Sequence, residues 1–315
     1  MKAAVITSFD QPPCYSDFPD PKPNGSTEVL VDVLAAGLHH VSRGRASGVH
    51  YSSTGELPLI AGVDGVGRGS DGKLRYFAQS PGQIGTMADK TIIELDHSIE
   101  LPDDCDPITM AGAMNPSMAS WIALRCRVSF QRGQRVLILG ATGSSGSMAV
   151  QIAQHLGASQ VIAVGRNEQR LAELFALGAT ETMALGNALL DVDAITRDVD
   201  VVLDFVWGES SVRFLETILR RRTDRNRPLT WIHIGSMGGE AATIPGAFLR
   251  SANLQIVGSG HGSVSGREIL MELPTLAKEI ARGTFRIDVR ATPLRNVEQT
   301  WLEAFPSSER IVFTP

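Results

Sequence analysis

The sequence predicts an α/β protein, with a doubly wound parallel sheet and a second, β-rich domain. A strand, a glycine turn and a helix follow one another in RVLILGATGSSGSMAVQIAQHLG, residues 135–157. Apolar runs then alternate with helical patterns as far as Val257, which is typical of a parallel sheet with crossover helices. The residues before Asn115 instead form short β-branched segments separated by Pro, Gly and Asn. At 315 residues the chain is too long for one typical core, so two domains are expected.

The glycine turn lies between two strongly patterned segments. Val136–Leu139 is a continuous apolar run, as in a strand buried on both faces, and apolar residues at helical spacing follow the turn. The turn has the G-x-G-x-x-G spacing with Ala first, and its predicted cofactor-binding residues are Ala141, Thr142, Gly143, Ser144, Ser145 and Gly146. Gly143 lets a pyrophosphate approach the backbone, and Gly146 lets the helix pack closely on the strand. The second apolar run, Val161–Val164, favours a dinucleotide-binding βαβ unit over a tight turn without ligand.

The end of the second strand predicts which dinucleotide binds. An acidic residue about twenty positions past the last glycine accepts the ribose hydroxyls of NAD, whereas this sequence reads Gly165-Arg166-Asn167. Arg166 can bind a 2′-phosphate through a charge-assisted pair, so these three residues predict NADPH. The alternative is an exposed arginine at a strand end.

The predicted domain boundary lies at Asn115-Pro116, where proline is expected to end one helix and open the next. Before it, strands are predicted at Lys2–Thr7, Val29–Ala36 and Ala88–Leu95. After the glycine turn, the predicted helices are Arg170–Leu177, Ser211–Arg221 and Gly266–Arg282, and the predicted strands are Val199–Phe205, Leu229–Ile234 and Leu254–Val257. The predicted domains are residues 1–115 rejoined by 266–315, and residues 116–265.

Composition excludes several classes of protein. The chain has 43% hydrophobic and 20% charged residues and a net charge of −5, which gives no reason to expect nucleic acid as a partner. Cys14, Cys105 and Cys126 are widely spaced and form no CxxC, which argues against a disulfide framework and suits a reducing cytoplasm. The N-terminal residues lack the layout of a signal peptide, and no apolar run is long enough to span a membrane. A cytoplasmic protein is therefore expected.

The order of these motifs resembles the medium-chain dehydrogenase/reductase superfamily. The β-rich domain, the Asn-Pro break, the AxGxxG unit and the segments VDVVLDFVWG, WIHIGSMGG, LQIVGSG and RIVFTP are similar to its zinc-independent quinone oxidoreductase and enoyl reductase branch. The resemblance implies a Rossmann domain and a GroES-like barrel. It also implies NADPH-dependent hydride transfer to a quinone or an α,β-unsaturated carbonyl. A homodimer is expected through the edge strand Leu254–Val257, which the family commonly uses.

The sequence departs from the zinc-dependent members of this family. They carry a GHE motif, where this chain reads Gly62-Val63-Asp64, and a cysteine, where this chain has His39. His39 and His40 are adjacent and would point to opposite faces of a strand, so they are not expected to chelate one ion. The carboxylate of Asp64 is expected to accept hydrogen bonds from backbone amides. A catalytic zinc site typically needs three protein ligands, so no metal site is predicted.

The remaining site residues follow from the resemblance, each with an alternative. His39 replaces an asparagine near the nicotinamide ribose and is a candidate proton donor, or it is a structural histidine. Tyr51 is a candidate to stack on the substrate or to donate a proton, or it merely covers apolar surface. Asn115 is expected to contact the cofactor, or it is a turn residue. The nicotinamide is expected to bind in the cleft between the domains, at the carboxyl ends of the strands. This placement adds four residues to the predicted cofactor site: Gly235, Ser236, Gly258 and Ser259.

Two other functions remain open from the sequence. One is a nucleotide-binding regulatory or accessory protein without catalysis, and the weaker one is an alcohol dehydrogenase. Five arginines between Arg220 and Arg227 would suit a polyanion, but Asp224 and Pro228 in the same stretch favour a solvated loop. Ser144 and Ser145 lack a G-x-S-x-G elbow and are interpreted as phosphate or backbone ligands rather than nucleophiles.

Overall fold

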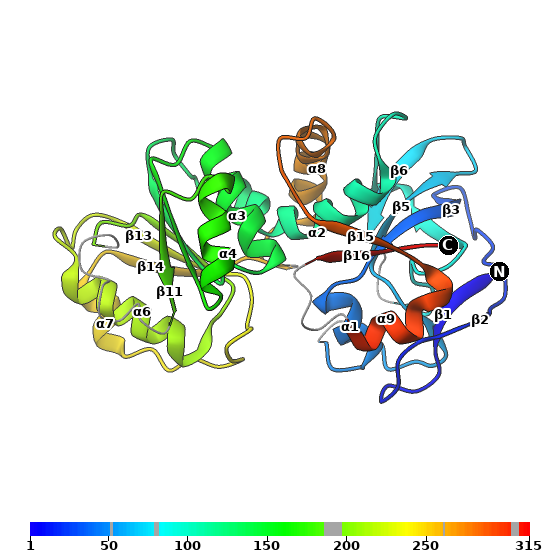
Figure 1. Ribbon diagram of the computed structural model, residues 1–315, viewed down its shortest axis with the longest axis horizontal. Helices are drawn as coiled ribbons and strands as arrows, with labels where there is room; N and C mark the ends of the chain where they lie inside the picture. The colour runs from blue at the N-terminus through cyan, green and yellow to red at the C-terminus, as the bar shows by residue number, and fades with distance from the viewer. Residues whose placement is uncertain (51–52, 79–81, 186–196, 261, 304–308) are drawn as a thin grey trace. The chain divides into compact units, whose positions relative to one another are not determined.

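The computed structural model describes residues 1–315 apart from 51–52, 79–81, 186–196, 261 and 304–308. The chain divides into two compact units, shown in Figure 1. One comprises Met1–Asn115 together with Leu270–Pro315, and the other comprises Pro116–Ile269. Tyr51, a predicted site residue, lies outside the described residues.

The second unit is built on a six-stranded sheet in which every pair of neighbouring strands is parallel. Its strands are β9 (Arg135–Leu139), β10 (Gln160–Gly165), β11 (Glu181–Ala184), β12 (Val201–Asp204), β13 (Leu229–His233) and β14 (Leu254–Gly258). The order β11-β10-β9-β12-β13-β14 reverses direction at β9, which confirms the predicted doubly wound sheet. The crevice at such a reversal, outside the carboxyl ends of the strands, is where ligands bind in this class of fold.

Helices cover both faces of this sheet. They are α3 (Ser144–His155), α4 (Glu168–Glu173), α6 (Gly208–Arg221) and α7 (Gly246–Ser251). In Figure 1, α3 and α4 lie together on one side of the sheet, and α6 and α7 lie on the other. The predicted helix Arg170–Leu177 begins earlier, because Asn167 caps α4, and its last part tightens into the 3₁₀ helix η3 (Leu174–Leu177). Gly178 ends it with a φ of 107°, in the left-handed region that favours glycine.

The core of this unit explains the continuous apolar runs. Leu137, Val202 and Trp231 come from neighbouring strands, and each is 1% exposed or less. They pack against Phe214 and Ile218 of α6, whose buried positions recur every three to four residues. A strand with helices on both faces has no polar side, so the alternation seen in half-exposed strands is absent from these segments.

The first unit is dominated by antiparallel strands in two sheets. One sheet has the order β2-β1-β4, and the other has the order β15-β16-β3-β5-β6-β8, with β7 also paired to β3. The strands are β1 (Lys2–Ile6), β2 (Cys14–Asp17), β3 (Glu28–Gly37), β4 (Leu59–Ile60), β5 (Asp64–Gly69), β6 (Leu74–Ala78), β7 (Lys90–Glu94), β8 (Ser98–Glu100), β15 (Val289–Pro293) and β16 (Arg310–Thr314). The predicted β-rich domain is therefore confirmed. Val312 of the C-terminal strand faces Gly37 of β3, so the tail completes this sheet.

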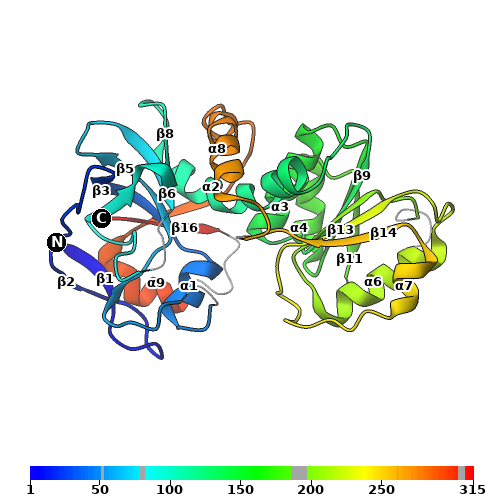
Figure 2. The same cartoon turned by 180° about the vertical axis from the view of Figure 1, so that it is seen from behind.

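Helices α1 (His40–Ala46) and α9 (Val297–Glu303) lie side by side in this unit, as Figures 1 and 2 both show. The guanidinium carbon of Arg43 lies 5.1 Å from the ring centroid of Trp301, which links the two helices. The other elements are α8 (Gly266–Ala281), the 3₁₀ helices η1 (Leu95–His97) and η4 (Leu294–Asn296), and the π-helix η2 (Ala123–Arg127). Within the described part of the chain, no helix is long and apolar enough to cross a membrane.

The predicted helix break at Asn115-Pro116 is wrong. Helix α2 (Pro107–Ile122) continues through Pro116. A proline inside a helix lacks one hydrogen bond and crowds the carbonyl four residues earlier, here that of Gly112. Gly112 packs so closely on Val289 that a Cβ would lie 2.7 Å from its Cγ2. Tertiary packing thus holds the helix together where its local sequence favours a break.

Candidate functional site

The glycine turn leads directly from β9 into α3. Gly143 is the N-cap of α3 and no side chain caps this helix end, so its first amide groups are available to an anion. A Cβ built on Gly143 would meet only the carbonyl oxygen of Gly140, at 3.6 Å. A Cβ on Gly146 would instead lie 2.2 Å from that oxygen, so only glycine allows α3 to pack this closely. The structure shows the close helix packing expected at Gly146, whereas the pyrophosphate contact expected at Gly143 stays a prediction.

The second strand ends beside this turn. A Cβ on Gly165 would lie 2.5 Å from Cγ2 of Thr142, so these two predicted residues are in close contact. Arg166 is exposed and has no ion pair with any described residue. Its guanidinium is therefore available to a phosphate. Asn167 accepts a hydrogen bond from the backbone nitrogen of Arg170 at 3.0 Å, so its side chain caps α4.

The carboxyl ends of β12, β13 and β14 hold the remaining predicted cofactor residues. The backbone nitrogen of Ser259 donates to the carbonyl of His233 at 2.8 Å, and Oγ of Ser236 lies 3.2 Å from Nε2 of the same histidine. Gly235 lies against Phe205, where a Cβ would be 3.1 Å from the carbonyl oxygen. The carbonyl of Gly258 accepts from Nε of Arg127 at 2.7 Å. The turns after these strands are thereby fixed to one another.

Trp207 lies at the same end of the sheet and was not predicted from the sequence. Its φ of 55° and ψ of −171° belong to a backbone region that is essentially restricted to glycine. Asp204 holds this turn: its Oδ1 accepts from the backbone nitrogens of Val206 and Trp207, and its Oδ2 accepts from Nε1 of Trp231 at 2.9 Å. The Trp207 ring packs on His233, with centroids 4.4 Å apart.

A separate buried cluster of polar side chains lies in the first unit. His39 is 6% exposed, and its Nε2 lies 2.9 Å from Oδ1 of Asp64, which is 1% exposed. The hydroxyl of Tyr76 donates to the other carboxylate oxygen of Asp64 at 2.7 Å. The sequence predicted backbone amides as partners of Asp64, and the structure corrects this, because both carboxylate oxygens accept from side chains.

The contacts of His39 define its tautomer. Its Nδ1 accepts from the backbone nitrogen of Ser42 at 3.4 Å, which makes His39 the N-cap of α1. Nε2 must then carry the proton and donate it to Asp64. Burial lowers the pKa of His39, and nearby Asp64 only partly opposes this effect, so the imidazole is neutral at pH 7. The hydroxyl of Ser42 lies 3.3 Å from Nε2.

Arg310 brings a buried positive charge into the same cluster. Burial lowers its pKa to about 10, opposed by Asp64 and Tyr76, so the guanidinium stays charged at neutral pH. One of its terminal nitrogens donates to Oδ1 of Asn115 at 3.2 Å. Asn115, predicted to contact the cofactor, is thus a partner of Arg310 in this structure. Arg310 and Asp64 are the opposite charges of this buried cluster.

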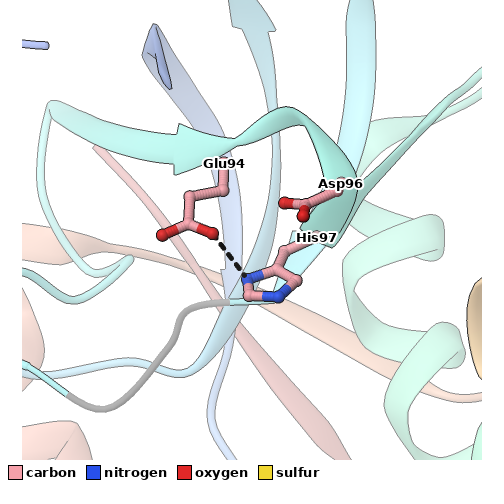
Figure 3. Close-up of side chains that lie close together, drawn as sticks. All are labelled: Glu94, Asp96 and His97. Carbon is pink, nitrogen blue, oxygen red and sulfur yellow. Dashed lines mark ion pairs between the residues drawn. The ribbon is translucent and has the colours of Figure 1, made fainter. Parts of the chain in front are cut away.

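Two other clusters of charged side chains offer no evidence of a metal or ligand site. Glu94, Asp96 and His97 lie together and are exposed, with Oε2 of Glu94 3.6 Å from Nδ1 of His97 (Figure 3). Exposed acidic groups of this kind are common without a bound ion. The arginine cluster is not the uniformly solvated loop that was predicted, because Arg222 is 5% exposed and donates to the carbonyls of Val199, Arg227 and Pro228.

Comparison with known proteins places this geometry in a family. The family model described as zinc-binding dehydrogenase matches residues 146–273. The chain is 29% identical to a probable NADPH-dependent quinone reductase of Emericella nidulans, over the whole of both chains. It is 24% identical to quinone oxidoreductase-like protein 2 of Rattus norvegicus, covering 82% of this chain and 74% of that one. These matches support the medium-chain dehydrogenase/reductase superfamily, in its quinone oxidoreductase-like branch.

Solved structures of this superfamily share the fold along the whole chain. The quinone oxidoreductase of Thermus thermophilus, solved also in complex with NADPH, superposes with a TM-score of 0.81 at 24% identity and covers 100% of both chains. A quinone oxidoreductase of Pseudomonas syringae superposes with a TM-score of 0.80 at 20% identity, covering 100% of this chain and 98% of that one. At these identities the likeness concerns the fold.

The residues in the zinc position of the superfamily do not fit a zinc ion. Val63 offers no ligand, and the proton on Nε2 of His39 faces Asp64. Both oxygens of Asp64 already accept hydrogen bonds, from His39 and Tyr76. A tetrahedral catalytic zinc needs three donors converging on one point, and this cluster instead satisfies its own polar atoms.

Sequence reasoning missed most of the buried cluster. The difference between GHE and Gly62-Val63-Asp64 drew attention to Asp64, but only as a structural partner of backbone amides. No signal marked Tyr76 or Arg310, because each lies in a strand of ordinary β composition. The hydrogen bond of Tyr76 to Asp64 and the electrostatic influence of Asp64 on Arg310 depend on strand pairing, which joins β5 to β6 and β16 to β3.

Proposed function

We propose that this chain is an NADPH-dependent oxidoreductase that transfers a hydride to a quinone or an α,β-unsaturated carbonyl without zinc. The observation that carries the proposal is the uncapped start of α3 with open space at Gly143, beside the exposed Arg166. The NADPH dependence of the relative from Emericella nidulans supports it. The donor set around Asp64 supports a reaction that needs no Lewis acid.

The chain's own residues would hold the cofactor by its phosphates. The amides at the start of α3 bind the pyrophosphate, and Arg166 binds the 2′-phosphate. The turns at Gly235-Ser236 and Gly258-Ser259 border the nicotinamide half of the crevice. When bound, the reduced nicotinamide supplies the hydride. With an electrophilic acceptor, positioning by these groups provides most of the catalysis.

The source of the proton that completes the reduction depends on the chemistry of the acceptor. A quinone takes its protons on oxygen and can receive them from water, whereas an enolate needs one delivered at carbon. His39 uses both ring nitrogens within the protein, so any proton it supplies must leave through the hydroxyl of Ser42, 3.3 Å from Nε2. We therefore assign His39 a positioning role and Ser42 the role of the exchanging hydroxyl.

The proposed function is tested by NADPH oxidation with 1,4-naphthoquinone and with an enone such as 3-nonen-2-one. Turnover of either acceptor supports the oxidoreductase. His39→Gln is expected to slow the enone more than the quinone. Tight NADPH binding without turnover across a broad acceptor panel would favour the accessory nucleotide-binding protein instead, and turnover of a primary alcohol alone would favour an alcohol dehydrogenase.

Replacing Arg166 is expected to remove the preference for NADPH. Arg166→Ala should raise the KM for NADPH about tenfold or more, because a hydrogen-bonded charge pair with the 2′-phosphate is lost, and should leave the KM for NADH nearly unchanged. Steady-state kinetics with both cofactors measures this. Arg170→Ala, on the next helix, is the matched control. An unchanged ratio of the two KM values in Arg166→Ala would show that this arginine does not bind the 2′-phosphate.

Metal removal is expected to have no effect. Dialysis against a chelator should leave both the turnover of a quinone and the melting temperature unchanged, because the polar atoms around Asp64 satisfy one another. Metal analysis of the untreated protein checks the same point independently. One zinc ion per chain, lost together with activity on chelation, would contradict the zinc-free reaction.

A homodimer is expected through the edge of the parallel sheet. Among the described strands, β14 pairs only with β13, so the backbone groups on its other edge can pair with a second copy about a two-fold axis. Sedimentation should give about twice the chain mass of 33.8 kDa. Ile256→Pro removes a backbone donor in this strand and is expected to favour the monomer. A wild-type monomer at micromolar concentration would reject the dimer.

A further inference from the structure

The carboxylate of Asp204 lies at the carboxyl end of β12, and the residue is 0% exposed. Its Oδ1 accepts from the backbone nitrogens of Val206 and Trp207 at 2.8 and 2.9 Å. Its Oδ2 accepts from Nε1 of Trp231, in β13, at 2.9 Å. All three partners are donors, so both carboxylate oxygens are needed as acceptors. Asp204 thereby joins the turn after β12 to the neighbouring strand.

The main chain of Asp204 holds a second turn, which follows β13. Its carbonyl oxygen accepts from the backbone nitrogens of Ile234 and Gly235, at 2.8 and 3.2 Å. The backbone nitrogen of Gly238 then donates to the carbonyl of Val206 at 2.6 Å. A Cβ on Gly238 would lie 2.8 Å from Cγ1 of Val206, so the two turns are packed closely together. The turn after β13, which contains predicted cofactor residues, is therefore held at both of its ends by the turn after β12.

The turn after β12 depends on the carboxylate because its backbone is strained. Trp207 has a φ of 55°, in a region that a residue with a side chain adopts only where its surroundings hold it. The carboxylate of Asp204 binds the amide of Trp207 and that of the residue before it. Without these two hydrogen bonds, the turn is expected to relax toward an ordinary backbone conformation. The turn after β13 would then move with it, because the two are in direct contact.

We propose that Asp204 is a positioning residue for hydride transfer, which acts by fixing the turn of Gly235 and Ser236 beside the nicotinamide. The inference rests on the proposed reductase function, in which this turn borders the nicotinamide half of the crevice. In the same function the phosphates bind elsewhere, at the start of α3 and at Arg166. Asp204 therefore sets the position of the reacting ring and contributes little to the affinity for NADPH.

The step that depends on this placement is the hydride transfer itself. The quinone accepts a hydride, which is two electrons and one proton, from the reduced nicotinamide, and it takes a second proton from water. The quinone is reduced to a hydroquinone and the nicotinamide is oxidised. Such a transfer is sensitive to distance, because a displacement of about 1 Å can slow a reaction about a hundredfold. Loss of the Asp204 contacts should therefore slow the reaction more than it weakens cofactor binding.

Asp204→Asn tests the proposal, because the side-chain amide keeps one acceptor oxygen and replaces the other with a donor. If the oxygen stays with the two backbone amides, the new NH2 group faces Nε1 of Trp231, which is also a donor. We expect kcat with 1,4-naphthoquinone to fall about tenfold or more, while the dissociation constant for NADPH changes by less than about threefold. The primary kinetic isotope effect, measured with NADPH deuterated at the transferred position, should rise because hydride transfer becomes more rate-limiting.

Two further variants separate this effect from a loss of stability. Trp231→Phe removes the opposing donor, so the double variant Asp204→Asn, Trp231→Phe should regain kcat by about threefold or more over Asp204→Asn. Asp200→Asn is the matched control. Asp200 is 7% exposed, directly precedes β12 at the other end of the strand, and pairs with Nε of Arg227 at 2.7 Å. This control should lower the melting temperature and leave kcat and the isotope effect unchanged.

The fluorescence of bound NADPH separates this inference from the proposed function, because it needs no turnover. The emission of the reduced nicotinamide depends on its surroundings, so Asp204→Asn should change the emission spectrum of bound NADPH and Asp200→Asn should not. Equal kcat and identical spectra in wild type and Asp204→Asn, or equal losses of kcat in Asp204→Asn and Asp200→Asn, would overturn the role of Asp204 while leaving quinone reduction intact. A spectrum that changes only in Asp204→Asn, in a chain that turns over no acceptor, would support the positioning role and reject the reductase.

Discussion

A valine at Gly143 is expected to abolish NADPH binding without destabilising the fold. The backbone of Gly143, with φ −82° and ψ 167°, lies in the extended region that valine prefers. A Cβ there has space within the protein, with only the oxygen of Gly140 at 3.6 Å. The added methyl groups instead occupy the position from which a pyrophosphate would reach the amides of α3. We expect the dissociation constant for NADPH to rise about a hundredfold or more, equivalent to about 2.8 kcal/mol.

The control for this prediction is Gly146→Ala. Its Cβ would lie 2.2 Å from the carbonyl oxygen of Gly140 and 2.6 Å from Cα of Ala141, so α3 must shift away from β9. This variant should lose stability by about 1–3 kcal/mol as well as cofactor affinity. Fluorescence titration with NADPH and thermal unfolding distinguish the two variants. Normal NADPH affinity in Gly143→Val would mean that no pyrophosphate binds at this turn.

Elements that are encoded by a short stretch of sequence could be predicted, whereas features that depend on contacts between distant residues could not. The strands of the parallel sheet were predicted because both of their faces are buried, which makes them continuous apolar runs. Strand β11 was not predicted, since its sequence Glu181–Ala184 has no such run. The break at Asn115-Pro116 was predicted from a local rule, and the contact of Gly112 with Val289, 177 positions later in the chain, overrides it.

Of the candidate sites, the glycine turn is encoded by a short stretch of sequence, whereas the buried cluster depends on contacts between distant residues. The glycine turn is a contiguous motif, so its residues and their roles were readable from spacing alone. The buried cluster joins residues from β5, β6 and β16, which come together only when these strands pair. His39 was identified as a departure from the family, but its role as the N-cap of α1 depends on the backbone direction after β3.

Removing the charge of Asp64 is expected to be the most destabilising single change in the first unit. Asp64→Asn removes the charge on the carboxylate that accepts hydrogen bonds from His39 and Tyr76, and whose charge opposes that of the buried Arg310. Weakening two buried hydrogen bonds to a charged group should cost about 3 kcal/mol. Tyr76→Phe, which removes one hydrogen bond to the same carboxylate, should cost about 1–3 kcal/mol.

Denaturant unfolding of these variants measures the differences in free energy. The exposed pair of Arg68 and Asp103, whose side chains are 45% and 80% exposed, provides the control, because Asp103→Asn should change stability by less than about 1 kcal/mol. Equal stability of Asp64→Asn and Asp103→Asn would show that the hydrogen bonds to the buried carboxylate do not depend on its charge.

The same cluster makes stability sensitive to acid through His39. Burial lowers the pKa of His39 in the folded protein, and Asp64 opposes this only in part. In the unfolded chain the imidazole has its ordinary pKa of about 6.5. Above pH 6.5 the imidazole is therefore neutral in both the folded and the unfolded state, and its burial does not make the free energy of unfolding depend on pH. As the pH falls below it, the unfolded state gains a proton that the folded state does not, so stability decreases until the pH reaches the folded pKa.

His39→Gln removes this titration and should flatten the dependence of stability on pH. The wild type is expected to lose at most about 1.4 kcal/mol per pH unit from this group below about pH 6.5, and the variant should lack that contribution. Unfolding midpoints at several values between about pH 8 and pH 5 measure both slopes. Identical slopes in wild type and His39→Gln would mean that His39 binds its proton equally in both states, contrary to its burial against Asp64 and Arg310.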